Sequence, residues 1–439
     1  MGDAGPLEET KTLKVAVIGG GPAGLGAAIA LSKLPDVEIS LFERAKELRE
    51  FGAGIRIGYN CWRVLELLGV ADRVKGHHKT STIHRNGLTG EKVGGTSVAN
   101  LPIKYQPRRV RRTRLQSALI SKVPPGVIQL NKKLASLEDL DTEGVRLTFQ
   151  DGTIHTADLV VGADGIRSIR FTGTTIWRAL IPVTSVAHIP ELTVSTSWWH
   201  GPTGHVYHSF VDDPEEVPYE ARMMEIAARN VVDPETVTGK TFSWGVPATK
   251  ERVESHFVVS DTVPFHHASS HMKPQSYDSR IRELLSKPQE GQWKEFSAFA
   301  GPRLEKLTGW NKVVLLGDAS HPLSGAFGSG AAFALEDGWI LARAIEYARS
   351  KSEPLEKALE VFDDIRSPYY LRMYQYLDEQ KAKVVGAKKS NPDATFESNL
   401  AARMQAFGGE DALPWIYRND IEDVWKTYLR KQSTPNGVR

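Results

Sequence analysis

The sequence predicts an α/β protein with a parallel sheet, a second and mostly antiparallel sheet, and a helical C-terminal tail. Apolar strand-like runs that lead directly into glycine and then into a helical segment occur near residues 15 and 313, which is typical of a parallel sheet wound with helices. The segment 172–300 instead contains short β-type runs separated by turn signals, which favours antiparallel pairing. Residues beyond 367 are polar and helical in pattern.

The first strand, glycine turn and helix form a nucleotide-binding pattern. An apolar run at residues 15–18 precedes three glycines with the spacing G-x-G-x-x-G, namely Gly19, Gly21 and Gly24. An alanine-rich helix is expected from there up to Pro35. The first glycine permits a tight turn, the second leaves room for a pyrophosphate, and the third lets the helix pack closely on the strand. The spacing indicates a Rossmann-like dinucleotide site.

The next strand, expected at residues 38–42, ends on an acid. Glu43 lies at the distance expected for a carboxylate that accepts both ribose hydroxyls of a dinucleotide. NAD and FAD both carry such a ribose, so this motif leaves the two cofactors open. Arg44 follows and is available to a 2′-phosphate, but beside an intact Glu43 we expect a solvated or adenine-stacking side chain.

Composition limits the classes of function. The 439 residues are 41% apolar and 25% charged with a net charge of +2, so nothing calls for a nucleic-acid partner. The single Cys61 excludes an internal disulfide and any cysteine-based metal centre. No apolar run approaches the ~20 residues that span a bilayer, and residues 1–12 lack the apolar core of a signal peptide. We expect a soluble, cytoplasmic protein without a membrane span.

Two later motifs favour FAD. A short strand at 159–161 leads into Ala163-Asp164-Gly165, and a second at 313–316 leads into Gly317-Asp318, a glycine-rich loop and a helix. Asp318 is placed to accept a ribityl hydroxyl. Amides at the start of the helix would stabilise negative charge on a reduced flavin ring. The residues expected there are Gly328, Gly330 and Ala331.

With these motifs in this order, the chain resembles the single-component FAD-dependent aromatic hydroxylases, and among them the salicylate hydroxylase-like monooxygenases common in fungi. The resemblance covers nearly the whole chain. Besides the motifs above, it is carried by Phe51-Gly52-Ala53-Gly54-Ile55, by Arg112 with Gln116, by Gly317-Asp318-Ala319-Ser320-His321-Pro322 and by Pro414-Trp415-Ile416-Tyr417. It implies that Gly54, Arg112, Gln116 and Asp164 contact FAD.

The resemblance also implies a Rossmann-like FAD-binding domain with an inserted, mostly antiparallel substrate domain. The FAD-binding domain is expected at residues 12–80, 106–170 and 301–390, the substrate-binding domain at 81–105 and 171–300, and a C-terminal helical segment at 391–439. The family carries a longer loop before the strand that begins here at Phe171, so this connection is unusually short or incomplete. Gly325 and Ser329 stand where many relatives have proline and glutamine.

The implied activity is hydroxylation of a phenolic or salicylate-like aromatic substrate with O₂ through a C4a-hydroperoxyflavin. FAD would be held non-covalently, NADH or NADPH would act as a transient cosubstrate, and the protein would be a monomer or homodimer. A flavin-dependent oxidase, or an epoxidase or reductase on the same fold acting on a secondary metabolite, is the alternative, because it would keep all three motifs.

Candidate substrate residues come from the middle segment. Arg178 is a charge on an apolar strand and either forms a buried ion pair or grips an anionic group of the substrate. Aromatic residues of this segment either form the sheet core or line a pocket for a flat ligand. We take Arg178 and Tyr207 as catalytic candidates, and His205, Trp244 and Pro322 as substrate contacts.

Three charged or polar groups have simpler interpretations. The run from Arg108 to Arg114 is expected to be largely solvated, apart from Arg112. His200, His205 and His208 lack carboxylate or cysteine neighbours at ligand spacing, so no metal site is expected; alternation along the strand would expose some of them. His321 cannot form a catalytic triad with its sequence neighbours Ser320 and Asp318, so a structural role is expected.

Overall fold

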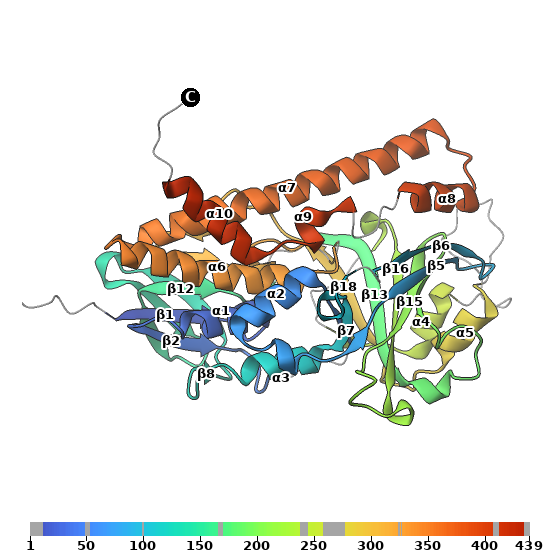
Figure 1. The fold of residues 1–439 in the computed structure, drawn as a ribbon, viewed down its shortest axis with the longest axis horizontal. Helices are drawn as coiled ribbons and strands as arrows, with labels where there is room; N and C mark the ends of the chain where they lie inside the picture. The colour runs from blue at the N-terminus through green and yellow to red at the C-terminus, as the bar shows by residue number, and fades with distance from the viewer. Residues whose placement is uncertain are drawn as a thin grey trace, which may run out of the picture.

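A parallel and an antiparallel sheet lie side by side, and a long C-terminal helix runs across both (Figure 1). The computed structural model describes residues 12–48, 53–98, 101–165, 170–237, 245–257, 277–323, 325, 327–406 and 412–433. Within these ranges the predicted fold class is confirmed: a wound α/β unit, a second sheet dominated by antiparallel pairs, and C-terminal helices.

The parallel sheet has the order β19-β20-β12-β1-β2-β8. Its strands are β1 (Leu13–Ile18), β2 (Val37–Phe42), β8 (Ile128–Gln129), β12 (Leu159–Gly162), β20 (Val313–Leu315) and β19 (Thr308–Gly309), the last being antiparallel to its neighbour. Ile18 pairs with both Phe42 and Gly162, so three strands end level with one another. Gly162 also pairs with Leu315, the last residue of β20, so the three motifs predicted from the sequence meet at one edge.

Helices cover one face of this sheet and a small meander covers the other. Helix α1 (Pro22–Leu31) packs on α6 (Gly330–Ser350), beside α2 (Tyr59–Leu68). The opposite face packs on β9 (Leu134–Asp139), β10 (Val145–Phe149) and β11 (Ile154–Ala157). Helix α1 ends at Leu31, one turn before the position predicted from Pro35.

The antiparallel sheet has the order β17-β18-β13-β16-β15-β14-β5-β6. Its strands are β5 (Ser81–Asn86), β6 (Lys92–Ser97), β13 (Arg170–Pro182), β14 (Thr196–His200), β15 (Gly204–Phe210), β16 (Met223–Val231), β17 (Val246–Pro247) and β18 (Lys294–Ala300). Only β14 and β5 pair in parallel. Strand β13 begins at Arg170, and Phe171 in it pairs with Phe299.

Two faces of this sheet have different surroundings. One face packs on α4 (Lys250–Phe257) and α5 (Ser279–Ser286), burying Trp177, Trp199 and Trp293. The other face turns toward a three-stranded sheet of β3 (Gly54–Ile57), β7 (Arg108–Arg111) and β4 (His77–His78), which leads into α3 (Arg112–Ile120). We call it the inner face, because it meets the FAD-motif half of the molecule.

The C-terminal helices tie the two halves together. Helix α7 (Leu355–Ser390) continues through Pro368 and reaches over the antiparallel sheet (Figure 1). Helix α8 (Phe396–Ala406) lies against β6, while α9 (Pro414–Tyr417) and α10 (Ile421–Ser433) return to α2 and α6. No helix within the described ranges is long and apolar enough to cross a membrane.

Candidate active site

In the first glycine turn, an added side chain would collide with neighbouring backbone at two of the three glycines and would meet nothing at the third. Gly19 has φ of 111°, and a side chain there would collide with the backbone of Ala163. A side chain at Gly24 would collide with the carbonyl oxygen of Gly19, because helix α1 crosses the strand so closely. Gly21, at the N-cap of α1, faces open space. This is the geometry that a phosphate against bare backbone requires.

Glu43 is fixed at the carboxyl end of β2. Its Oε2 accepts a hydrogen bond from the Gly20 amide at 2.7 Å, and its Oε1 accepts one from the Ala45 amide at 2.8 Å. The carboxylate thus braces the glycine turn at the position predicted for ribose contact, and each of its oxygens keeps a further lone pair that can accept a hydrogen bond. Arg44 is exposed.

The start of helix α6 is also unobstructed. Its N-cap is Ser329, and side chains added at Gly328 (φ 61°) or Gly330 would meet nothing within 4 Å. Asp318 lies nearby in the turn after β20, and burial raises its pKa, opposed by His321 and Arg112. Ala331 is half-buried in the first turn of the helix.

A small cleft joins α1 and α3. Arg112 and Gln116 line it together with Pro22, Leu25 and Ile55, so the two predicted polar residues share one face of α3. The Arg112 amide donates to the Ala53 carbonyl oxygen at 3.0 Å, which holds α3 against the segment before β3. Among the other predicted cofactor residues, Asp164 is half-buried directly after β12.

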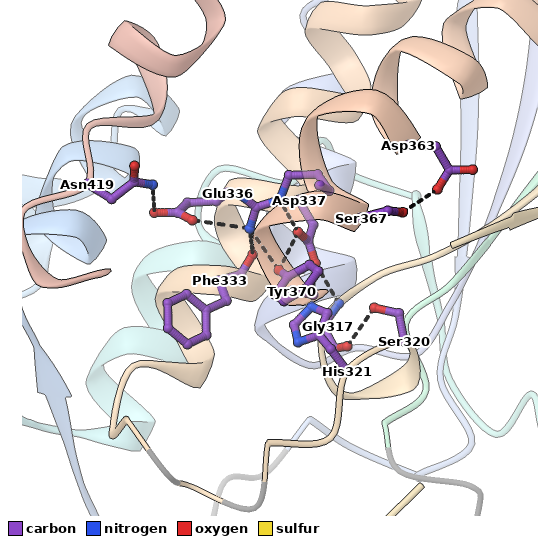
Figure 2. A network of polar contacts seen from close by, with 11 residues as sticks. Gly317, Ser320, His321, Phe333, Glu336, Asp337, Asp363, Ser367, Tyr370 and Asn419 are labelled. Carbon is purple, nitrogen blue, oxygen red and sulfur yellow. Dashed lines mark hydrogen bonds and ion pairs between the residues drawn. The ribbon is translucent and has the colours of Figure 1, made fainter. Parts of the chain in front are cut away.

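A buried ionic network braces the turn that carries Asp318 (Figure 2). The Asp337 Oδ2 accepts hydrogen bonds from the Gly317 amide and His321 Nε2, each at 2.9 Å. Its Oδ1 accepts from Arg366 Nε and Tyr370 Oη, each at 2.7 Å. These neighbours lower the pKa of Asp337 although burial alone would raise it. The network confirms that His321 is structural, and Pro322 is buried next to it.

On the inner face, the charges centre on Glu225. This fully buried carboxylate of β16 accepts from Arg109 of β7, with Nε at 2.6 Å, and lies 3.6 Å from Arg178 Nη1 of β13. Arg178 also donates to the Gly54 carbonyl oxygen at 3.4 Å. Burial lowers the pKa of Arg178 to about 10, with Arg109 and Arg112 adding repulsion and Glu225 opposing. The structure therefore leaves both interpretations of Arg178 open, the buried ion pair and the contact with an anionic group of the substrate, because the single carboxylate of Glu225 contacts two guanidinium groups.

Aromatic side chains continue the inner face beyond Arg178. The Tyr207 ring lies 5.1 Å from the Arg109 guanidinium carbon and 4.6 Å from the Trp198 ring, and Trp198 lies 4.7 Å from His205. Burial raises the pKa of Tyr207, opposed mainly by Arg109. Trp177 is on the opposite face, hydrogen-bonded to Glu295, so Arg178 is the inward member of that pair. Trp244 falls outside the described residues.

Two sequence-based expectations were wrong. The arginine run is only partly solvated: Arg114 is exposed, but Arg108 stacks on Trp62 at 3.8 Å, Arg109 pairs with Glu225, and Arg111 pairs bidentately with Asp212. Successive side chains of strand β7 point to opposite faces, and acidic residues far away in the sequence pair with its arginines, which explains this burial. The histidines do not alternate into solvent either, because His200 and His208 are buried and His205 is half-buried.

Gly54, which the resemblance places against FAD, also lies close to the antiparallel sheet. A side chain on Gly54 would collide with Glu225 and Arg109, so the glycine permits close contact between β3 and the antiparallel sheet. No group of three or more histidine, cysteine or acidic residues within the described ranges could hold a metal ion.

Several structural residues were missed. Glu225, Asp337, Arg366 and Tyr370 carry the two ionic clusters, yet none belongs to a motif with local spacing. The only local signal was the acid pair Glu336-Asp337 within an otherwise apolar helix, because charges almost never occupy such positions without partners.

The comparisons with known proteins agree with this geometry. A family model described as "FAD binding domain" matches residues 12–369. The chain belongs to this family. The salicylate hydroxylase of Pseudomonas putida is 26% identical over 450 residues, covering 93% of each chain. The 3-amino-4-hydroxybenzoate 2-monooxygenase PtnB3 of Streptomyces platensis is 28% identical over 425 residues, covering 92% of this chain and 95% of the relative.

A solved structure supports the fold. The complex of a salicylate hydroxylase with its substrate superposes with a TM-score of 0.71 at 21% identity, covering 96% of this chain and 98% of that one. The family model and the solved structure thus confirm the family, the fold class and the FAD cofactor that the sequence predicts. The residues fit FAD: the open positions at Gly21, Gly328 and Gly330 form a cradle that any larger side chain would narrow.

Proposed function

We propose that the protein is an FAD-dependent monooxygenase that uses NADH or NADPH and O₂ to hydroxylate a phenolic or salicylate-like aromatic substrate. FAD, when bound, supplies the redox chemistry. Glu43 would hold the ribose, the amides after Gly21 the pyrophosphate, and Asp318 the ribityl chain. The start of α6 would stabilise negative charge on the reduced ring. Arg112 and Gln116 would contact the cofactor from α3.

The observation that carries this proposal is that Arg112 connects the cofactor cradle and the inner face. Arg112 directly follows β7 and lines the cleft between α1 and α3, and its charge opposes the rise in the pKa of Asp318 and adds to the fall in the pKa of Arg178. Arg178 would hold the phenolic oxygen of the substrate, and Tyr207 would pack against its ring. Burial by the inner face and by α7 would keep water from the reacting atoms.

The domain boundaries support the same assignment. Strands β5 and β6 join β13–β18 in one sheet although residues 106–165 separate them in sequence, which fits a discontinuous substrate domain at 81–105 and 171–300. The soluble composition fits a cytoplasmic enzyme, acting as a monomer or homodimer.

The test is NADH and NADPH oxidation by the FAD-loaded protein against a panel of phenols and hydroxybenzoates, with product analysis. We expect substrate-stimulated oxidation and a ring-hydroxylated product. Arg178→Ala should raise KM or abolish the stimulation while FAD absorbance is retained, and Arg178→Lys should recover only part of it because an ammonium lacks the guanidinium fork. Oxygen uptake that yields only hydrogen peroxide with every compound would instead favour a flavin oxidase.

A further inference from the structure

Arg56 of β3 reaches the start of helix α6. Its Nη1 donates a hydrogen bond to Ser329 Oγ at 3.1 Å, and Ser329 is the N-cap of α6. The guanidinium also lies over the ring of Tyr417, with its central carbon 5.0 Å from the ring centroid. Tyr417 in turn donates to the Phe327 carbonyl oxygen in the turn before α6. The charge of Arg56 is therefore held against the beginning of this helix.

Gly58 gives the guanidinium its position. Gly58 is the N-cap of α2, and a Cβ added to it would lie 2.5 Å from Arg56 Nη1 and 2.8 Å from its Cζ. Any larger residue would therefore displace the guanidinium from Ser329. On the other side of the strand pair, Arg109 of β7 is the direct neighbour of Arg56, and Glu225 compensates the charge of Arg109.

The first turn of α6 has neither an acidic residue nor a side-chain cap, and the structure describes this helix throughout. Serine at an N-cap usually accepts a hydrogen bond from an amide of the first turn. The hydroxyl of Ser329 instead accepts from Arg56. The side chain of Ser329 thus leaves the first-turn amides, the positive end of the helix dipole, available to a ligand.

A cation beside this end of a helix is an unfavourable arrangement. Acidic groups are the favoured neighbours of a helix N-terminus, because the aligned peptide dipoles place partial positive charge there. Arg56 adds a full positive charge at the same place. Its field also reaches α2, where it opposes the rise that burial causes in the pKa of Cys61. Negative charge supplied at the start of α6 would stabilise both the guanidinium and the helix end.

We propose that Arg56 raises the reduction potential of the bound FAD by placing its charge where the ring becomes negative. A hydride from NADH or NADPH adds to N5 of the ring and leaves one negative charge shared by N1 and the C2 carbonyl oxygen, while the nicotinamide becomes NAD⁺ or NADP⁺. The protein tunes this step through the charge that it places near the ring. The inference rests on the proposed function for the position of the flavin ring at the start of α6.

The midpoint potential of the bound FAD tests this proposal, measured at pH 8 by equilibration with a dye of known potential and without aromatic substrate. Arg56→Gln keeps a hydrogen-bond donor for Ser329 but removes the charge. It should disfavour the reduced ring at least tenfold, which lowers a two-electron potential by about 30 mV. Arg56→Lys should recover most of this difference. Gly58→Ala retains the arginine but displaces its guanidinium, so it should lower the potential in the same direction and tests the proposal even where Arg56→Gln holds too little FAD.

Arg343→Gln is the matched control. It removes an arginine of the same helix, roughly three turns beyond the start of α6, that pairs with Glu346. Its potential should equal that of the wild type.

The pH dependence of the potential separates the charge from a structural effect. A two-electron potential falls by about 30 mV per pH unit when one proton accompanies the electrons, and by about 59 mV when N1 takes a second proton. Removal of a positive charge makes N1 easier to protonate. The pH at which the slope changes should therefore rise by at least one unit in Arg56→Gln and stay in place in Arg343→Gln.

Wild-type potentials in both Arg56→Gln and Gly58→Ala, or an equal shift in Arg343→Gln, would overturn the proposal. Weaker binding of an aromatic ligand to Arg56→Gln at an unchanged potential would assign the residue to the substrate and would overturn it as well. Failure of the proposed function would appear only as missing hydroxylation during turnover. It would leave the difference in potential in place, because no substrate is present in that measurement.

Discussion

Glu336 is a buried carboxylate whose ionisation opposes folding, and its replacement by glutamine gives a prediction with a defined sign. It lies in α6, fully buried, and accepts hydrogen bonds from Arg366 Nη2 at 3.2 Å and Asn419 Nδ2 at 3.1 Å. Burial nevertheless raises its pKa from 4.5 to about 7; Arg366 and Asn419 oppose the rise and Asp337 adds to it. The folded state thus prefers the protonated side chain.

The magnitude follows from the two pKa values. Because the folded pKa is the higher one, the stabilising contribution of Glu336 is complete below pH 4.5 and is lost as the pH rises to about 7. At about 1.36 kcal/mol per pH unit, the loss is about 3 kcal/mol in all, of which about 2.5 kcal/mol falls between pH 5 and pH 8. Glu336→Gln cannot ionise, so its stability relative to wild type should improve by that amount over this range.

The assay is urea unfolding at saturating FAD, repeated from pH 5 to pH 8, with the free energy of unfolding obtained by linear extrapolation. Glu346→Gln is the matched control on the same helix, because Glu346 is exposed and pairs only with Arg343 at the surface. Its difference from wild type should not change with pH. A constant difference for Glu336→Gln, or one that falls as the pH rises, would refute the reasoning.

Three further predictions concern the cofactor cradle. Gly24→Ala should yield no soluble protein, whereas Gly21→Ala should keep a wild-type circular dichroism spectrum but lose FAD. The same outcome for both variants would contradict the geometry of the glycine turn. Asp318→Ala should weaken FAD binding by about 1.5–3 kcal/mol in a fluorescence titration without unfolding the chain, and full FAD affinity would exclude the assignment. Tyr417→Phe should cost about 0.5–1.5 kcal/mol of FAD affinity, since Tyr417 Oη donates to the Phe327 carbonyl oxygen at 3.1 Å before α6; an unchanged dissociation constant would remove α9 from the site.

The parts of the fold that were predictable from sequence depend on local rules. In all three motifs a strand leads within a few residues into glycine, and the register of β1 with β2 and β12, and of β12 with β20, brings the strand ends together as the parallel sheet requires. Strands β16 and β18 were not recognised. Met223–Val231 is rich in methionine and alanine, which favour helices, and only pairing with β13 and β15 makes it a strand. A proline normally ends or kinks a helix, so the sequence did not indicate that α7 continues through Pro368.

The ionic clusters could not be predicted, because their partners are far apart in sequence. Arg109 and Glu225 are 116 residues apart, and Arg111 and Asp212 are 101 apart. A run of like charges predicts solvent exposure only when no acidic residues from elsewhere in the chain pack against it. Here the antiparallel sheet places Glu225 and Asp212 against the arginines.

The arrangement of Glu225 links these clusters to the proposed chemistry. It lies on β16, its partner Arg109 lies on β7 beside α3, and Arg178 lies on β13, so one carboxylate joins the two halves of the molecule where they face the cofactor cradle. With Arg109 satisfied by this carboxylate, Arg178 keeps a weaker contact of 3.6 Å with Glu225 and a hydrogen bond of 3.4 Å to the Gly54 carbonyl oxygen, which fits its proposed role as the substrate contact. Among the described residues, Arg229 of β16 and Arg403 of α8 have no such acid. Among the described residues the inner face is therefore graded, from a charge that Glu225 compensates at the domain junction to the uncompensated charges of Arg229 and Arg403 at its far side.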